Sequence, residues 1–451
     1  ASTQQSAAVA IGYQAGQITQ GNNSVSVGTN AGQNTQGQNC VAIGVQSGQG
    51  SQGTGAIAIG YQAGQTSQAA NAVAIGISAG SLTQNSAAIA IGYLAGNVSQ
   101  QQNSISIGNT AGQTLQGTNS IAIGFTAGQV FQNSRSIAIG VSAGESQQNY
   151  ESIAIGYNAA SQSQGLQSIA IGSGAGQTSQ QNFGIAIGPN AASLTQGVQS
   201  IAIGLYAAQS AQGNNAIAIG SGAGQSAQGN NTIAIGLQAA QFTQQSLAIA
   251  IGFSAGAYTQ GIAAIAIGSS FSATQGAPAY TAQGQFGIAI GVAAGASTQQ
   301  SGAVAIGYQA GQIGQSSNSI AVGVQAGQTS QSAQSISIGF QAGQTNQAQS
   351  AIAIGAQAGQ GTQGSGAIAI GYQAGASQQA SRAVAIGTSA GTITQGTNAI
   401  AIGYLAGATQ QGQNAIAIGA SFSATQGAPA TTFQGTNAIA IGSAAGGSTQ
   451  G

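Results

Sequence analysis

Apolar and polar residues recur along this chain with a period of 16 residues. A tetrapeptide of the Ile-Ala-Ile-Gly type ends at Gly12 and then every 16 residues up to Gly268. After one step of 23 residues the series resumes at Gly291 and continues in steps of 16 to Gly419. A second step of 23 reaches Gly442, so the array holds 27 repeats. A repeated supersecondary unit is therefore the first thing that the sequence predicts.

The columns of this array keep a fixed character when they are counted from the last Gly of each tetrapeptide, which we call the reference Gly. The residues three and one before it are Ile or Val, and the residue two before it is Ala or Ser. The residue three after it is Ala except at Ser47, Phe271 and Phe422. The residue eight after it is Gln in every regular repeat, and Gln283 and Gln434 match it in the two longer ones.

These columns predict an all-β fold, a single-chain parallel β-solenoid or β-roll of 27 coils. Sixteen residues are too few for a helix-pair repeat, whereas the Ile-Ala-Ile alternation is that of a strand. A second short strand is expected in the Thr/Ser-rich stretch that ends at the Gln. The reference Gly and polar residues such as Gly21 and Asn22 provide the turns. At a spacing of roughly 4.8 Å per coil, the array would be a rod of roughly 130 Å.

The Ile-Ala-Ile strand is apolar on both faces, so its orientation decides what the rod exposes. We expect the Ile/Val pair to fill the core together with the Ala three after the reference Gly. The Ala/Ser column between them would then point outward, and its small residues would let another subunit pack closely. The alternative is that Ala is merely tolerated on an open face. A long apolar stripe is more than monomers usually expose, which favours side-by-side association.

The Gln column is the most regular polar feature of the chain. Gln side chains in register bond amide to amide along a stack, so we interpret this column as a structural ladder. The alternative is a row that binds a ligand.

The column just after the reference Gly carries many aromatic residues. We expect these rings to pack against neighbours, with stacking on sugars or on a surface as the alternative. They are Tyr13, Tyr61, Tyr93, Phe125, Tyr157, Phe253, Tyr308, Phe340, Tyr372 and Tyr404.

The array is expected to form one continuous β-solenoid over residues 1–451, with looped-out insertions within 269–290 and 420–441. Both insertions carry the segment FSATQGAPA. Pro278 and Pro429 lack the N–H that a strand ladder needs, so these residues should loop outward. Phe271 and Phe422 would plug the core there. The array also contains duplicated blocks, since residues 49–96 closely resemble residues 360–407.

The composition excludes most kinds of catalytic and metal-binding site. The chain has two basic and two acidic residues, no His and a single Cys40. We therefore predict no catalytic, cofactor-binding or metal-binding residue, no cofactor and no enzyme activity. A net charge of zero disfavours nucleic acid, and no apolar run is long enough to insert into a membrane. Arg135 and Glu151 lie one repeat apart and should form an exposed ion pair.

Neither end of the array shows a cap. Uncapped solenoid ends recruit other chains, so the array is expected either to continue or to stack end to end.

The repeats resemble the head repeats of trimeric autotransporter adhesins, the YadA-like or Hep_Hag repeats. Two examples are SIAIGYNAASQSQG at 152–165 and NAIAIGYLAGATQQG at 398–412. Similar repeats occur in some phage and viral fibres. The resemblance implies a left-handed parallel β-roll that assembles as a trimer and serves in surface attachment. The present repeat is longer than is usual in that family, and neither a coiled-coil stalk nor a membrane-anchor barrel is recognisable.

The sequence thus predicts a structural fibre or stalk protein on the outside of a cell or virion, built from copies of itself and suited to adhesion. One alternative is a binding module that presents a flat, regular face to polysaccharide or ice, although no column is consistently Thr. A second is an intracellular storage or scaffolding filament.

Overall fold

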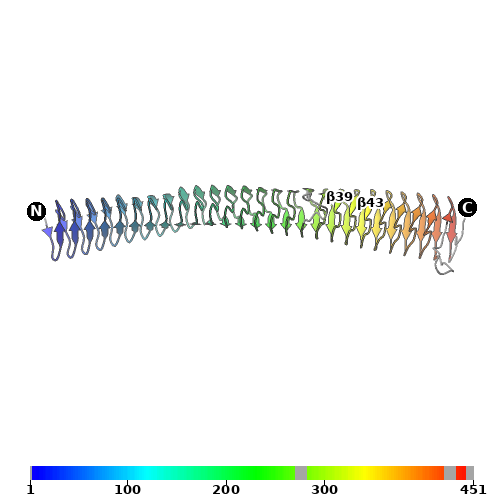
Figure 1. The fold of residues 1–451 in the computed structure, drawn as a ribbon, viewed down its shortest axis with the longest axis horizontal. Helices are drawn as coiled ribbons and strands as arrows, with labels where there is room; N and C mark the ends of the chain where they lie inside the picture. The colour runs from blue at the N-terminus through cyan, green and yellow to red at the C-terminus, as the bar shows by residue number, and fades with distance from the viewer. Residues whose placement is uncertain (1–2, 270–281, 421–432, 443–451) are drawn as a thin grey trace. The chain divides into compact units, whose positions relative to one another are not determined.

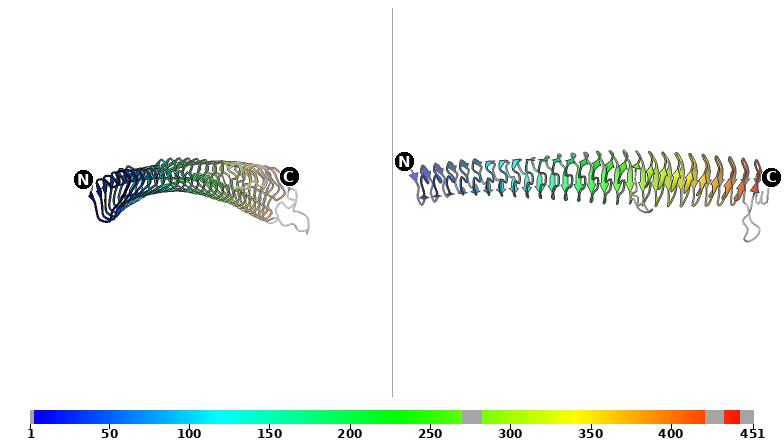
Figure 2. Two further views of the ribbon diagram at one scale, coloured as in Figure 1. Left: turned by 60° about the vertical axis from the view of Figure 1, so that its left-hand side comes forward. Right: turned by 45° about the horizontal axis from the view of Figure 1, so that its top comes forward.

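The computed structural model describes residues 3–269, 282–420 and 433–442. They form two compact units, residues 1–227 and 228–451. Each unit is a parallel β-solenoid, and every regular element among the described residues is a short strand. Figures 1 and 2 show one coil after another along each unit, every coil contributing one strand to each of two sheets. The predicted all-β solenoid with a 16-residue repeat is confirmed.

The even-numbered strands make up the first sheet, which we call the Ile sheet, and each covers the three residues before a reference Gly. Their bounds are β2 (Val9–Ile11), β4 (Val25–Val27), β6 (Val41–Ile43), β8 (Ile57–Ile59), β10 (Val73–Ile75), β12 (Ile89–Ile91), β14 (Ile105–Ile107), β16 (Ile121–Ile123), β18 (Ile137–Ile139), β20 (Ile153–Ile155), β22 (Ile169–Ile171), β24 (Ile185–Ile187), β26 (Ile201–Ile203), β28 (Ile217–Ile219), β30 (Ile233–Ile235), β32 (Ile249–Ile251), β34 (Ile265–Ile267), β36 (Ile288–Ile290), β38 (Val304–Ile306), β40 (Ile320–Val322), β42 (Ile336–Ile338), β44 (Ile352–Ile354), β46 (Ile368–Ile370), β48 (Val384–Ile386), β50 (Ile400–Ile402), β52 (Ile416–Ile418) and β54 (Ile439–Ile441).

The odd-numbered strands make up the second sheet, which we call the Gln sheet, and each ends at a Gln of the regular column. Their bounds are β1 (Thr3–Gln4), β3 (Thr19–Gln20), β5 (Thr35–Gln36), β7 (Ser51–Gln52), β9 (Ser67–Gln68), β11 (Thr83–Gln84), β13 (Val98–Gln100), β15 (Thr114–Gln116), β17 (Val130–Gln132), β19 (Gln147–Gln148), β21 (Ser163–Gln164), β23 (Ser179–Gln180), β25 (Thr195–Gln196), β27 (Ala211–Gln212), β29 (Ala227–Gln228), β31 (Thr243–Gln244), β33 (Thr259–Gln260), β35 (Ala282–Gln283), β37 (Thr298–Gln299), β39 (Ile313–Gln315), β41 (Thr329–Gln331), β43 (Thr345–Gln347), β45 (Thr362–Gln363), β47 (Gln378–Gln379), β49 (Thr394–Gln395), β51 (Gln410–Gln411) and β53 (Phe433–Gln434).

Neighbouring coils pair in strict parallel register. In the Ile sheet Ala58 lies opposite Ala74, and in the Gln sheet Gln52 lies opposite Gln68. The register also holds across the two 23-residue steps, where β33 pairs with β35 and β51 with β53. The insertions that separate these strands, with the predicted Phe plugs and outward Pro residues, fall at 270–281 and 421–432 and lie outside the described residues.

The orientation of the Ile-Ala-Ile strand is opposite to the prediction. In β46 the central Ala369 is fully buried, whereas Ile370 keeps 36% of its surface exposed. The same pattern, with the middle residue inside and the flanking residues partly outside, recurs from coil to coil. The expected Ile/Val core and the expected outward Ala column are therefore both wrong.

The physical reason for this orientation is the small size of one strand face. Side chains alternate along a strand, so the residues four and two before the reference Gly point the same way. Both columns hold only small residues, such as Ala56 and Ala58. This face packs against the Ala three after the reference Gly, and together they form clusters such as Ala58, Ala63, Ala74 and Ala79. An Ile pointing inward would hold the two sheets apart.

The Gln column fills the remaining interior. Gln68 is 2% exposed, and Gln residues of this column are the largest fully buried side chains. The Gln68 amide nitrogen donates across the coil to the carbonyl oxygen of Ile57 (2.7 Å) and to that of Ala72 (3.1 Å). It also lies 3.1 Å from Oε1 of Gln84 in the next coil. An amide bonded in this way joins the two sheets and two neighbouring coils, and the predicted structural ladder is confirmed.

The ladder differs between the two units. In residues 228–451 an amide-to-amide bond links every successive pair from Gln228 to Gln434, including both 23-residue steps. In residues 1–227 the buried Oε1 of Gln164 has no hydrogen-bond partner among the described residues. Its coil carries Ala160 where most coils have Gly. Ala240 occupies the same place beside Gln244, which keeps its ladder bonds. The buried Oε1 of Gln20 also has no partner among the described residues, although its coil carries Gly16, so the Ala in this column does not by itself decide whether the ladder bond forms.

Two Gly columns make the sharp turn between the sheets. Gly60, a reference Gly, has φ of +132°, and a Cβ there would lie 2.6 Å from the carbonyl oxygen of Gly76 in the next coil. Gly64, four residues later, has φ of +52°, and its Cβ would meet the flexible amide of Gln68 at 2.8 Å. In the first column an added Cβ would therefore collide with the backbone of the neighbouring coil, and in the second with the end of a flexible side chain.

Alanine substitutions at these two positions should differ strongly in cost. We expect Gly64→Ala to lower the free energy of unfolding by about 1 kcal/mol, because it puts a methyl group on a left-handed residue. Gly60→Ala should cost more than about 3 kcal/mol, because neither backbone can move away without breaking the register. Ala160→Gly is the matched reverse change and should stabilise the protein. Urea unfolding monitored by circular dichroism measures all three, and equal losses for the two Gly variants would contradict this account.

A carboxyl group in the ladder should make stability depend on pH. In Gln68→Glu the protonated carboxyl donates to only one of the acceptors that the amide serves, and burial disfavours its charged form. The folded-state pKa therefore lies above the unfolded value of about 4.3. The variant's stability should be highest below that value and fall as pH rises through it. Thermal unfolding of this variant and of wild type between pH 3 and pH 8 tests this, and a pH-independent difference would speak against a buried ladder.

Candidate interaction surfaces

The outer face of the Ile sheet carries two parallel columns of Ile and Val. The column just before the reference Gly is the more open one, with Ile354, Ile370 and Ile386 each 36% exposed. The column two residues earlier is of intermediate exposure. The strand register places each pair directly beside the next, as between Ile370 and Ile386. The Ile sheet therefore presents a continuous apolar stripe within each unit, and its outward residues are Ile and Val, not the expected Ala.

The aromatic column lies at the edge of the Ile sheet, one residue after the reference Gly. Its rings are about half exposed, as at Tyr61 (50%) and Tyr372 (51%). Neighbouring coils in the described part of the chain therefore cover only about half of each ring. The expected packing against neighbours is partial within one chain.

Buried and half-buried amides near the surface form further ladders, which we call the surface amide ladders and which were not predicted from the sequence. In the second unit, the Gln residues two after the reference Gly bond in sequence from Gln309 through Gln325, Gln341 and Gln357 to Gln373 (2.9–3.3 Å). A second ladder, five after the reference Gly, connects Gln312, Gln328, Gln344 and Gln360 at 3.0 Å. Bonds from Gln328 to Gln309 and from Gln360 to Gln341 join the two. The recurrence of Gln in these columns was the available signal.

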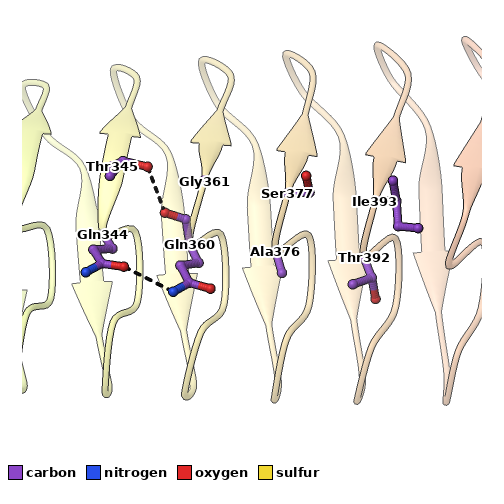
Figure 3. Close-up of a pocket in the computed structure, with 8 residues that line it drawn as sticks. All are labelled: Gln344, Thr345, Gln360, Gly361, Ala376, Ser377, Thr392 and Ile393. Carbon is purple, nitrogen blue, oxygen red and sulfur yellow. Dashed lines mark hydrogen bonds between the residues drawn. The ribbon is translucent and has the colours of Figure 1, made fainter.

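A shallow groove of about 440 Å³ borders the second of these ladders. Figure 3 shows Gln344 and Gln360 on adjacent coils, followed on the next two coils by Ala376 and Ser377 and by Thr392 and Ile393. Gln360 donates to Gln344 (3.0 Å), and the Thr345 hydroxyl donates to the backbone oxygen of Gln360 (3.1 Å). The lining contains amides, hydroxyl groups and apolar atoms, so the groove offers hydrogen bonds and contact area but no acid, base or thiol. Its lining residues are Gln344, Thr345, Gln360, Gly361, Ala376, Ser377, Thr392 and Ile393.

The predicted ion pair is present. Arg135 and Glu151 approach to 2.7 Å, with the Arg side chain 64% exposed. Glu151 also accepts a bond from the amide of Gln167 in the following coil (2.6 Å). An exposed pair of this kind contributes about 0–1 kcal/mol. In the described part of the chain, no cluster of three His, Cys, Asp or Glu residues is placed to hold a metal ion. The same part contains no helix that is long and apolar enough to span a membrane.

Cys40 is fully buried, four residues before a reference Gly. Its thiol lies 2.9 Å from the carbonyl oxygen of Gly53, and the Ser24 hydroxyl makes the equivalent bond to Gly37 (2.7 Å). Burial raises the pKa of the Cys40 thiol above its ordinary value of 9.0, although contacts with the backbone of Ala56, Gly55 and Gly37 oppose the shift. The thiol is therefore part of the core, not a reactive group.

The Cys40 thiol should make the wild-type protein lose stability at high pH. Because the folded state holds this proton more tightly than the unfolded state, the free energy of unfolding falls as pH rises past the unfolded thiol pKa of about 9. Cys40→Ala is the matched control, since Ala56 and Ala72 fill the same column in the next coils. Urea unfolding at pH 7 and pH 10 should show a larger loss for wild type than for the variant, and equal losses would refute the assignment.

Three segments of the chain, residues 149–175, 363–390 and 395–421, match the YadA head domain repeat. No protein with a curated description matches the chain. The matched segments contain both repeats quoted above for their resemblance to that family, SIAIGYNAASQSQG and NAIAIGYLAGATQQG. The parallel β-solenoid, with one 16-residue repeat per coil, is the structure that these segments adopt. These three segments of the chain therefore carry YadA-like head repeats.

Proposed function

We propose that this chain is a structural fibre or stalk segment on the outside of a cell or virion, formed by side-by-side association of copies through the Ile sheet and suited to adhesion. The observation that carries the proposal is the apolar stripe of Ile and Val on that sheet. Monomeric proteins rarely leave so regular an apolar surface in water. YadA-like head repeats support a fibre of the adhesin type.

The rest of the proposal follows the repeat architecture. Residues 1–451 form one continuous solenoid, left-handed like the family it resembles. The copies assemble as a trimer, and end-to-end contacts extend the fibre. Such a protein has no enzyme activity and requires no cofactor.

Charges on the apolar stripe should separate the copies. We expect Ile354→Lys, Ile370→Lys and Ile386→Lys together to convert the assembly to monomers, because burying three ammonium groups costs more than the contact provides. The matched control is Thr362→Lys, Gln378→Lys and Gln410→Lys, which places the same charges on the exposed face of the Gln sheet.

Analytical ultracentrifugation measures the assembly, and circular dichroism checks that both variants keep their strands. The wild type and the Gln-sheet variant should sediment as one oligomer, and the Ile-sheet variant as a monomer. A monomeric wild type would refute the proposal.

A further inference from the structure

The aromatic column contains two rows in which a ring recurs on every second coil. In the second unit the row is Tyr308, Phe340, Tyr372 and Tyr404, each 47–51% exposed. The coils between them carry Val324, Ala356 and Thr388 at the same position. In the first unit Tyr61, Tyr93, Phe125 and Tyr157 repeat with the same 32-residue spacing and are 49–58% exposed. At about 4.8 Å per coil, the rings in each row are about 9.6 Å apart.

Steric crowding does not require this alternation. Elsewhere in the second unit Phe242 and Tyr258 share another column, six residues after the reference Gly, on successive coils. Their rings stack with centroids 5.0 Å apart. Rings on neighbouring coils are therefore compatible with the solenoid. Omitting every second ring leaves each remaining ring as a separate platform, with a smaller residue on either side.

The backbone holds the second-unit row in place. The N–H of Gln325 donates to the carbonyl oxygen of Tyr308 (2.8 Å), and Gln357 makes the same bond to Phe340 (2.7 Å). Ser389 does so to Tyr372 (2.8 Å). Each ring thus sits on a turn that is hydrogen-bonded to the next coil, so little backbone entropy would be lost when a ligand binds.

Amide groups run alongside this row. The ladder from Gln309 to Gln373 occupies the position next to the rings, and the ladder from Gln312 to Gln360 is bonded to it. An amide has two N–H donors and a carbonyl oxygen with two lone pairs. Gln325 and Gln357 each donate one ladder bond and accept one. Each therefore keeps one N–H and one lone pair for the hydroxyl groups of a ligand.

We propose that these aromatic rows bind along the chain of a neutral β-1,4-linked polysaccharide. Aromatic faces pack on the C–H faces of pyranose rings, and amides bond the hydroxyl groups at their rims. Successive sugars of a β-1,4-linked chain are turned over, so the same face recurs once per disaccharide. That repeat is close to twice the spacing of β-strands, which is the spacing of the rings.

The scarcity of charged residues in this chain favours a neutral polysaccharide over a charged one. An anionic chain would call for Lys or Arg along the row, and the whole sequence has only two basic residues. An α-1,4-linked glucan coils and does not present one face at a regular linear spacing. This inference rests on the proposed function, because it names the material to which the adhesive fibre would attach. It also requires the aromatic rows to stay accessible when copies associate through the Ile sheet.

Binding of the full chain to insoluble cellulose and to insoluble chitin tests the proposal, with an α-linked glucan as the negative control. Wild type should bind at least one of the two β-1,4-linked materials. Replacing all eight ring residues of both rows with Ala should weaken binding at least about tenfold. The matched control replaces four exposed aromatics outside the rows, Phe131, Tyr150, Phe183 and Phe286, and should bind as wild type does.

A register variant keeps the composition and changes only the spacing. It combines Tyr372→Thr with Thr388→Tyr, and Tyr93→Asn with Asn109→Tyr, and it should also lose binding. Unchanged binding by this variant, or no binding by wild type, would overturn the proposal. So would a change in the sedimenting mass of the eight-residue variant, which would make the rows contacts between copies. Failure of the fibre model would instead appear as a monomeric wild type.

Discussion

The buried Gln ladder is the interaction on which the rest of this structure depends. A coil of 16 residues encloses an interior lined mainly by Ala, Ser and Gly, which bury little apolar surface. The Gln amide fills that interior and bonds three groups at once: the opposite sheet, the turn that follows, and the same residue of the next coil. Because a buried polar group without a partner costs about 1–3 kcal/mol, any slip in register would be penalised at every coil. The ladder therefore supplies both cohesion and register.

The ladder also determines which side chains lie on the outer surface of the protein. The amide reaches the backbone of the Ile sheet only if that sheet lies close, and only Ala or Ser between the sheets allows this. The large Ile and Val side chains are left on the outside. An apolar stripe suited to contact between copies is thus a consequence of a small, polar interior, and the strict register turns every surface column into a straight row. The spacing of the aromatic rows and of the surface amide ladders is therefore set by the spacing of the coils.

The periodicity predicted the architecture well, because one 16-residue repeat admits few arrangements. The Gly columns, the two strands of each coil, the Gln ladder and the pair of Arg135 with Glu151 could all be derived from position alone. The predicted orientation of the Ile-Ala-Ile strand was wrong, because hydrophobicity alone favours placing the Ile side chains in the core. The column four before the reference Gly, which holds small residues such as Ser24, Cys40 and Ala56, was the signal that this face is the inner one. The surface amide ladders depend on side-chain conformations, which a sequence pattern does not give.

Hydrogen exchange of the Gln side-chain amides tests the central claim most directly. In protein labelled with ¹⁵N at Gln, nuclear magnetic resonance reports the exchange of each side-chain NH₂ group. The ladder residues, such as Gln68 and Gln379, should exchange much more slowly than exposed residues such as Gln378. Their protection should be lost only when the coils themselves open. Ladder amides that exchange as fast as the exposed ones would show that the interior is not held by them, and would contradict the account.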